Sequence, residues 1–236
     1  MRRLVFAAFL LSCGAEMTIV EGNGVLATEE RAVPGVTAFT VATSGDVTVR
    51  LGSPASVLVT AEENILPRLT SDVLSGHLTL GREPFVTLRL RKPISYTLTV
   101  PELRAVSVSS SGGVTTPVLT TSSLALAISS SGSIVVAGVD ANTLTTSITS
   151  SGDVRVGSGA VVNHHVTISS SGDVIADGLR STSAHVTLSS SGDALLWVTD
   201  ALDATLSSSG NVRFYGAPMV NVTATSSGRA LALGAR

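Results

Sequence analysis

Three aspartates recur at a fixed interval in this chain. Asp153, Asp173 and Asp193 are equally spaced, and Asn211 follows after a slightly shorter interval. If the chain repeats its path between them, their side chains stack about 5 Å apart on one surface. Carboxylates that close repel one another unless water or a cation lies between them, and a column of oxygens suits calcium. The alternative is an Asx-type turn, in which the aspartate accepts a backbone N–H bond. We favour the turn over calcium, and calcium over catalysis.

A second polar column contains His165, His185, Asp203 and Asn221, which all stand at the same distance before a repeated glycine. Two imidazoles and a carboxylate could ligate a transition metal. The ordinary alternative is a solvated strand face, and we therefore assign no metal ligand. His164 should point the opposite way from His165, because successive side chains of a strand alternate.

A repeated Ser-Ser-Gly sets the spacing of both columns. Its glycines lie at Gly112, Gly132, Gly152, Gly172, Gly192, Gly210 and Gly228. A fixed period of this length is typical of a solenoid. A nucleophilic serine needs a base and an oxyanion site of its own, so seven near-equal copies argue against one. The sequence therefore indicates no catalytic residue.

The residues around each glycine alternate between apolar and polar. The fourth position before it and the second after it are apolar, as at Ile168 and Val174, and the third before it is Ser or Thr. A period of two predicts strands. Equivalent strands stack most simply in parallel, so we predict an all-β, right-handed parallel β-helix (a β-solenoid) with about 18 to 20 residues per coil. We expect corner hydroxyls to bond to one another, and each glycine to allow a backbone angle that a Cβ would oppose.

Residues 20–105 are less regular but still β-like, as in VTAFTVA at 36–42 and SVLVTAE at 56–62. We interpret them as irregular first coils or a cap, followed by regular repeats over 106–236, within a single β-helix domain at 20–236. A cap is needed because an open β-helix end exposes core and strand edges. For the same reason we expect homo-oligomers to form through the β-helix ends, with strand edges near 231–236 pairing with a second copy.

The N-terminus, MRRLVFAAFLLSCGAEM, has two arginines and then a short apolar run. This pattern predicts an export signal, too short to remain as a membrane span. Cys13 follows Leu-Leu-Ser, which resembles a bacterial lipobox. We therefore predict a signal peptide at 1–12, a lipid on Cys13, a tether at 13–19 and residence at the outer membrane or cell surface. The alternative is cleavage after Ala15, which would leave the chain in the periplasm.

Composition excludes some partners. Fifteen basic and seventeen acidic residues give a net charge of −2, and no basic stripe is interleaved with aromatics, so we expect no nucleic-acid partner. Aromatic residues make up only 3% of the chain. Trp197 and the pair Phe214-Tyr215 occupy related places in successive coils, where they could form a small ledge for a ligand or fill the core.

Three segments carry a family resemblance: EGNGVLATEERAVPGVTAFTVATSGDVTVRLG, EENILPRL and VPELRAVSVSSSGGV. Over about residues 20–233 the chain resembles the bacterial family of auto-transporter adhesin heads, or GIN domains. The resemblance implies an exported, often lipid-anchored right-handed β-helix with an adhesive role, and it supplies no catalytic residues. That family repeats Gly-Ser-Gly-(Asp/Asn)-(Ile/Val), where this chain has Ser-Ser-Gly-(Asp/Asn)-Val.

We therefore expect a non-enzymatic envelope or surface protein that acts as an adhesion or binding scaffold. Its expected partners are the membrane through the lipid, a glycan or surface-protein ligand, and a second copy of itself. No cofactor is expected, with calcium on the aspartate column as the alternative. The alternative function is a carbohydrate-active β-helix enzyme of lyase or hydrolase type. Such an enzyme would need a groove in which Asp153, Asp173 or Asp193 lies close to Arg155 or Arg213.

Overall fold

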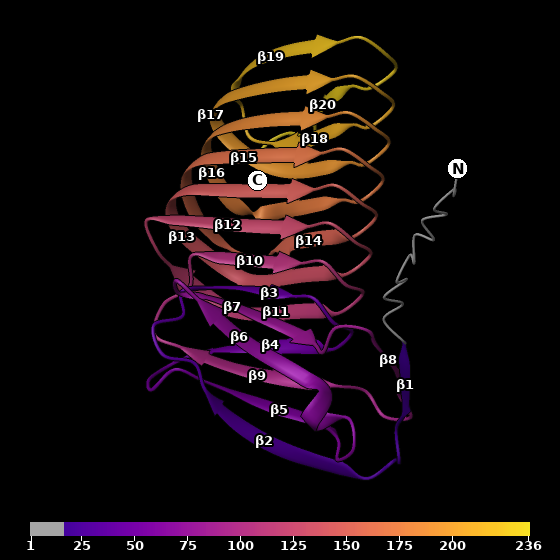
Figure 1. The fold of residues 1–236 in the computed structure, drawn as a ribbon. Coiled ribbons are helices and arrows are strands. Elements are labelled where there is room, and N and C mark those ends of the chain that lie inside the picture. Colours follow the sequence, from indigo (N-terminus) through magenta and orange to yellow (C-terminus); the bar gives the residue numbers. More distant parts are fainter. Residues whose placement is uncertain (1–16) are drawn as a thin grey trace, which may run out of the picture.

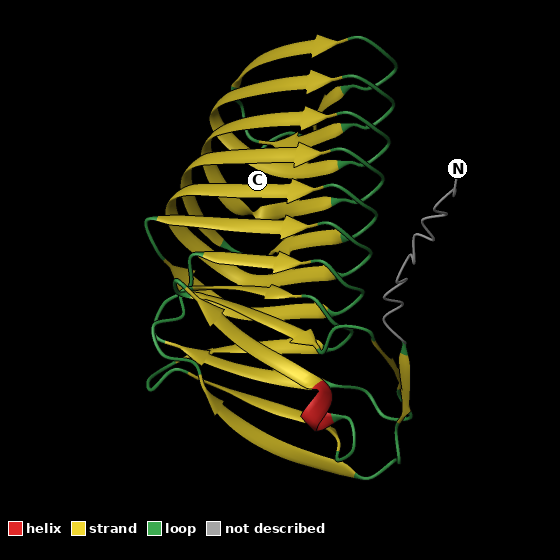
Figure 2. Cartoon of the chain, viewed as in Figure 1, coloured by secondary structure: helices red, strands yellow, loops and turns green. Residues whose placement is uncertain are grey.

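The computed structural model describes residues 17–236, and within them the predicted all-β solenoid of stacked parallel coils is confirmed (Figures 1 and 2). The helical content of this part of the chain is one 3-10 turn, η1 (Leu66–Arg68). No helix in it is long and apolar enough to cross a bilayer. The signal peptide and Cys13 lie outside the described residues.

The N-terminal section holds nine strands: β1 (Thr18–Glu21), β2 (Leu26–Ala32), β3 (Ala38–Val41), β4 (Asp46–Leu51), β5 (Ser56–Glu62), β6 (Leu69–Leu74), β7 (His77–Arg82), β8 (Val86–Arg89) and β9 (Ser95–Val100). The regular section continues with β10 (Ala105–Val108), β11 (Gly113–Thr120), β12 (Ser123–Ile128), β13 (Ser133–Ile148), β14 (Asp153–Val156), β15 (Gly159–Ile168), β16 (Val174–Leu188), β17 (Ala194–Leu206), β18 (Val212–Tyr215), β19 (Met219–Ala224) and β20 (Ala230–Ala232).

The aliphatic columns form the core of the regular section. On one side of the corner Ile148 pairs with Ile168, and Ile168 with Leu188, in parallel register. On the other side Val154 pairs with Val174. All five side chains are buried. Fully burying an aliphatic side chain contributes roughly 1.5–3 kcal/mol, so the repeated column stabilises every coil in the same way.

The period becomes shorter between β16 and β17. Ala176 pairs with Leu196, but the next partners are Arg180 and Trp197, so the newer coil omits Asp177, Gly178 and Leu179 of the return turn. A second register shift after Ser181 acts in the opposite direction and restores part of the length. The corner and both core columns stay aligned because the return turn absorbs the difference.

Next to the regular section, the N-terminal section forms one regular coil. Farther from it, the section forms an antiparallel cap. The corner at 43–46 joins β3 to β4, which pair in parallel with β10 and β11. Strands β7 and β9 continue the stack beneath them, again in parallel. Beyond these strands the pairing turns antiparallel, through β6 on one side and β5 and β2 on the other (Figure 1). This cap covers the N-terminal end of the core.

The C-terminal end of the stack is uncovered in the described chain. Val220 and Val222 stand in register with Leu202 and Ala204, which are buried, yet they are 45% and 40% exposed. The chain then turns back along the side of the stack, where Arg236 forms a 3.1 Å ion pair with the Asp177 carboxylate. The last coil therefore presents core side chains and a free strand edge.

Candidate functional site

The aspartate column lies at the corner and links successive coils. The backbone N–H of Asp173 donates to Oδ1 of Asp153 at 3.0 Å, and that of Asp193 to Oδ1 of Asp173 at 2.9 Å. The Asn211 N–H donates to Oδ1 of Asp193 at 2.7 Å. The carboxylates thus accept backbone N–H bonds, with donors in the next coil rather than in their own turn.

The same kind of hydrogen bond between coils also occurs in the N-terminal section. Asp46 occupies this column in the first coil, and its Oδ1 accepts the N–H of Gly113 at 2.9 Å. At the other end Asn211 accepts the N–H of Arg229 through its side-chain oxygen at 3.2 Å. Asn211 therefore makes the same kind of bond without a charge. Arg213 lies 3.8 Å from Oδ2 of Asp193, which is a loose ion pair in a solvated position.

The corner serines differ from the expected hydroxyl ladder. The Ser110 hydroxyl donates to the backbone carbonyl of Thr43 at 2.8 Å, and the Ser130 hydroxyl donates to the carbonyl of Ser110. These two hydroxyls therefore bond to the backbone of the preceding coil rather than to each other. In these two corners a backbone carbonyl of the preceding coil lies within reach of the hydroxyl, and a carbonyl is an obligatory acceptor.

The corner glycines are required by close approach, so the expectation based on backbone angle was wrong. From Gly112 to Gly228 no corner glycine has a positive φ. A methyl group on Gly172 would overlap the carbonyl oxygen of Gly152, and one on Gly192 would overlap that of Gly172. The coils stack at the strand spacing of about 4.8 Å, which leaves no room for a Cβ at this point.

The histidine column is present and lies on the surface. His165, His185 and Asp203 pair in register across β15, β16 and β17, and all three are exposed. The two imidazole centroids are 6.3 Å apart, and Asp203 accepts a 3.1 Å bond from the Asn221 amide. His165, His185 and Asp203 border a pocket of about 230 Å³. Within residues 17–236 no three His, Cys, Asp or Glu side chains are placed to hold one metal ion.

His164 points into the core, as the alternation predicts. It is 1% exposed, and its Nε2 lies 3.4 Å from the Thr146 hydroxyl. Burial, with a smaller contribution from neighbouring His165, lowers the pKa of His164 to about 4. This imidazole is therefore neutral at physiological pH.

The aromatic residues divide between surface and core. Trp197 and Tyr215 pair in register and are half-buried, whereas Phe214 is buried. The guanidinium of Arg236 lies 5.7 Å from the Trp197 ring centroid and 5.6 Å from that of Tyr215. The ledge therefore already holds a cation from its own chain.

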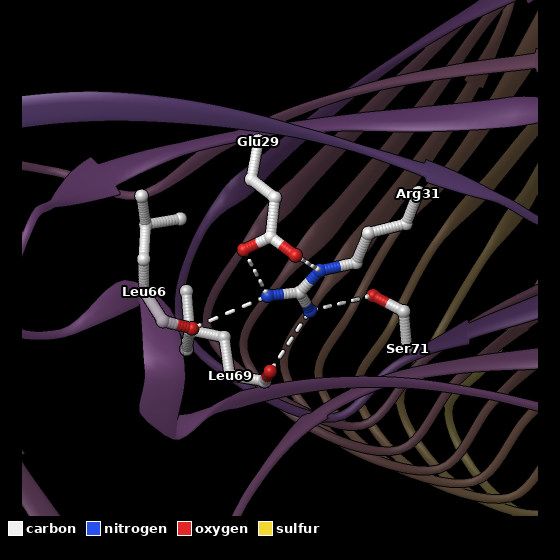
Figure 3. A network of polar contacts seen from close by, with 5 residues as sticks. All are labelled: Glu29, Arg31, Leu66, Leu69 and Ser71. Carbon is white, nitrogen blue, oxygen red and sulfur yellow. Dashed lines mark hydrogen bonds and ion pairs between the residues drawn. The ribbon is translucent and has the colours of Figure 1, made fainter.

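The sequence pattern did not predict two polar clusters of the cap. The first is centred on the Arg31 side chain (Figure 3). Its guanidinium forms a bidentate pair with Glu29, both contacts at 3.1 Å. It also donates to the carbonyl oxygens of Leu66 and Leu69 and to the Ser71 hydroxyl, at 3.2, 2.8 and 3.1 Å. One side chain thus joins β2 to η1 and β6, and its task is structural.

The second cluster is a buried carboxylate. Glu62 accepts the backbone N–H groups of Gly24, Arg91 and Lys92 at 2.5, 2.9 and 3.3 Å. Burial raises the pKa of Glu62, but these three donors and the charge of Arg91 together outweigh burial and leave the pKa below its usual value. The strand alternation places Glu62 on the outer face, so the sequence pattern predicts exposure. The one sequence feature that fits a buried Glu62 carboxylate is the glycine at position 22, because a Cβ there would overlap that carboxylate.

The comparisons agree with this architecture. A protein described as a "putative adhesin" from Bacteroides fragilis superposes with a TM-score of 0.86 at 19% identity, covering 91% of this chain and 100% of its own. A "putative lipid binding protein" from Parabacteroides distasonis gives 0.78 at 21% identity, covering 92% and 100%. A "putative adhesin" from Parabacteroides merdae gives 0.75 at 22%, covering 92% and 99%. At these identities the likeness establishes the fold.

The search of curated proteins found no match. A family model does match, over residues 36–218. This span runs from the first coil to the start of the last one. The chain therefore belongs to the family described as "Putative auto-transporter adhesin, head GIN domain".

Proposed function

We propose that this chain is an exported, non-enzymatic scaffold of the cell surface or envelope that serves in binding and adhesion. The observation that carries the proposal is the match of residues 36–218 to an adhesin-head family. The stacked solenoid supports it, because a rigid rod presents repeated polar columns. Many weak contacts to a repetitive surface then add through multivalency.

The use of the aspartate column also supports a non-enzymatic role. Asp153, Asp173 and Asp193 each use one oxygen to accept a backbone N–H of the next coil. A general acid or base must instead reach a proton on the substrate. Because the same bond recurs at each of these coils, it accounts for the aspartates as elements of the stack.

Attachment to the membrane is part of the proposal. The Leu-Leu-Ser-Cys sequence ending at Cys13 supports lipid modification of that cysteine. The lipid would hold the solenoid at the outer membrane or cell surface, with the domain beginning a few residues later at β1. Cleavage after Ala15 would instead release the chain into the periplasm.

The partners proposed are a glycan or surface-protein ligand and a second copy of the chain. The uncovered edge of β19 carries no charged residue, whereas the outermost strand of the cap, β2, carries Glu29, Glu30 and Arg31. Charges on an edge oppose strand pairing, and an uncharged free edge favours it. The sequence placed the pairing edge near 231–236, but the last strand, β20, ends at Ala232, so the proposed edge is β19. Two copies would meet through their last coils, with β19 antiparallel to its symmetry mate.

A binding assay tests the proposed function. The purified chain is coupled to beads at several densities, and the beads are offered to immobilised polysaccharides and extracellular proteins. We expect saturable binding that steepens with surface density, without oligosaccharide products on chromatography. Release of oligosaccharides would overturn the non-enzymatic assignment, and absence of binding at every density would overturn adhesion.

Light scattering tests the self-association. The wild-type chain is expected to form dimers, and Val222→Lys is expected to be monomeric. Arg155→Glu on the outer side of the stack is the matched control and should remain dimeric. A monomeric wild-type chain would contradict association through the last coil.

A further inference from the structure

An exposed aromatic residue occupies a backbone position that normally belongs to glycine. Phe85 has a φ of 60°, and its side chain is 63% exposed. It follows Glu83 and Pro84 in the tight turn between β7 and β8. A turn with proline at its second position and a positive φ at its third favours Gly or Asn there. A bulky side chain in the left-handed region costs free energy of about 1–3 kcal/mol.

The surrounding structure fixes this turn without using the ring. The carbonyl of Phe85 accepts the N–H of Thr18 at 2.9 Å, and the N–H of Glu83 donates to the carbonyl of Arg68 at 2.9 Å. The Arg68 guanidinium also pairs with the Glu83 carboxylate at 2.8 Å. The next side chain, Val86, is buried. Backbone bonds therefore impose the conformation, and glycine would meet them at lower cost.

Phe85 borders a polar pocket of about 380 Å³ beside the β6–β7 pair. The floor is the antiparallel pair of β6 and β7, where Thr70 faces Gly81 and Asp72 faces Thr79. A methyl group on Gly81 would lie 3.0 Å from the Thr70 hydroxyl oxygen. Glycine therefore keeps the floor open. Arg82, Glu83 and Phe85 complete the wall.

We infer that this pocket binds a neutral pyranose unit of a glycan; the inference rests on the proposed binding function and names its ligand class. A pyranose has a face of C–H groups and a rim of hydroxyls. Phe85 offers an exposed apolar ring to that face. Thr70, Thr79 and Asp72 accept bonds from hydroxyls, and Arg82 donates to them. The volume lies within the range of small-ligand sites.

The charges around the pocket select a neutral sugar over an acidic one. The charged residues of the lining are Asp72, Glu83 and Arg82, and Glu83 is paired with Arg68, so no net positive charge faces a ligand. An acidic sugar would also meet the Asp72 carboxylate at the floor, and like charges repel. The larger pocket of about 420 Å³ beside Asp140 has no aromatic residue in its lining, so it lacks the platform for a sugar face.

The test combines an oligosaccharide array with titration of the strongest neutral binder by calorimetry. Phe85→Ala removes the ring and keeps the strained angle, whereas Phe85→Gly removes both. Both variants should lose affinity by about tenfold or more, and Phe85→Gly should melt no lower than wild type. Ser75→Gly is the matched control, because Ser75 also has a positive φ, of 51°, in an exposed turn of the cap. It should bind as wild type does.

Each outcome decides the inference. Loss of neutral-sugar binding in both Phe85 variants, with Ser75→Gly unaffected, supports it. Unchanged affinity in Phe85→Ala, or binding restricted to sialylated glycans, overturns it. Binding to the immobilised extracellular proteins of the bead assay, without binding to any glycan, would overturn this site and leave the proposed function standing. A chain that binds neither class would overturn both.

Discussion

The backbone N–H of Asp193 donates a 2.9 Å hydrogen bond to Oδ1 of Asp173 in the preceding coil. The same bond joins Asp173 to Asp153 at 3.0 Å. The aspartate column is therefore a set of inter-coil clasps, in which each carboxylate satisfies a backbone donor at the corner. This hydrogen bond needs a side chain that is long enough to bring an acceptor oxygen to the next coil. Asn211 supplies such an oxygen without a charge.

The first prediction separates the acceptor from the charge at Asp173. Asp173→Asn should leave the free energy of unfolding within about 0.5 kcal/mol of wild type, because asparagine keeps the acceptor oxygen. Asp173→Ala should lower it by about 1–3 kcal/mol, because the backbone N–H of Asp193 loses its acceptor. Urea unfolding measures both. Equal losses in the two variants would show that the negative charge is what matters.

The second prediction concerns the corner glycine. Gly172→Ala should lower the free energy of unfolding by about 2 kcal/mol or more, because the methyl group overlaps the Gly152 carbonyl and the coils must separate. Ser171→Ala, at the exposed neighbouring position, should change it by less than about 0.5 kcal/mol. Thermal melts of the two variants provide the comparison. A stable Gly172→Ala would mean that the corner can widen at little cost.

The third prediction is a pH dependence from His164. Its pKa is about 4 in the folded chain and about 6.5 in an unfolded one. Below pH 6.5 the unfolded state takes up a proton that the folded state refuses, so stability falls as the pH drops from 6.5 to 4. The loss amounts to roughly 3 kcal/mol.

Urea unfolding across this pH range tests the effect. His164→Leu should remove the part of the pH dependence that His164 causes, because leucine already stands at this core position in the preceding coil, at Leu144. His185→Gln, on the exposed column, should keep it. The same slope in wild type and His164→Leu would refute the assignment.

The fourth prediction concerns the cap. Glu62→Gln should loosen the loops at Gly24 and Arg91, because an amide offers one acceptor oxygen where the carboxylate offers two. Faster hydrogen exchange of the Gly24, Arg91 and Lys92 amides would report it. The folded pKa of Glu62 is lowered, so its contribution to stability is present above pH 4.5 and is lost as the pH falls through the folded pKa. Unchanged protection of those amides in Glu62→Gln would argue against this role.

The fifth prediction concerns Cys13. In a bacterial host, the wild-type chain should incorporate a labelled fatty acid and sediment with membranes. Cys13→Ser should lose the label and become soluble. Ala15→Leu, which blocks the alternative cleavage pattern, should retain it. A wild-type chain without label would contradict lipidation of Cys13.

Periodicity made the regular coils predictable. Ile148, Ile168 and Leu188 recur at equal spacing, and equal segments stacked in parallel must place them in one column. The same logic predicted that Asp153, Asp173 and Asp193 would align. It did not predict their donors, because a hydrogen bond between coils depends on the exact height of one corner above the next. For the same reason, the periodicity did not show that the corner glycines are required by the close approach of successive coils rather than by their backbone angle.

The sequence by itself determined the solenoid, its period, the core columns and the position of each corner, since a repeated segment meets the same neighbours in every coil. Tertiary structure alone decided the contacts that occur once. Arg31 reaches Leu69, and Glu62 reaches Arg91, although each pair is far apart in the sequence. Phe85 faces a pocket whose floor comes from β6 and β7. No period encodes such contacts, because each depends on how a non-repeating chain folds over the end of a repeating one.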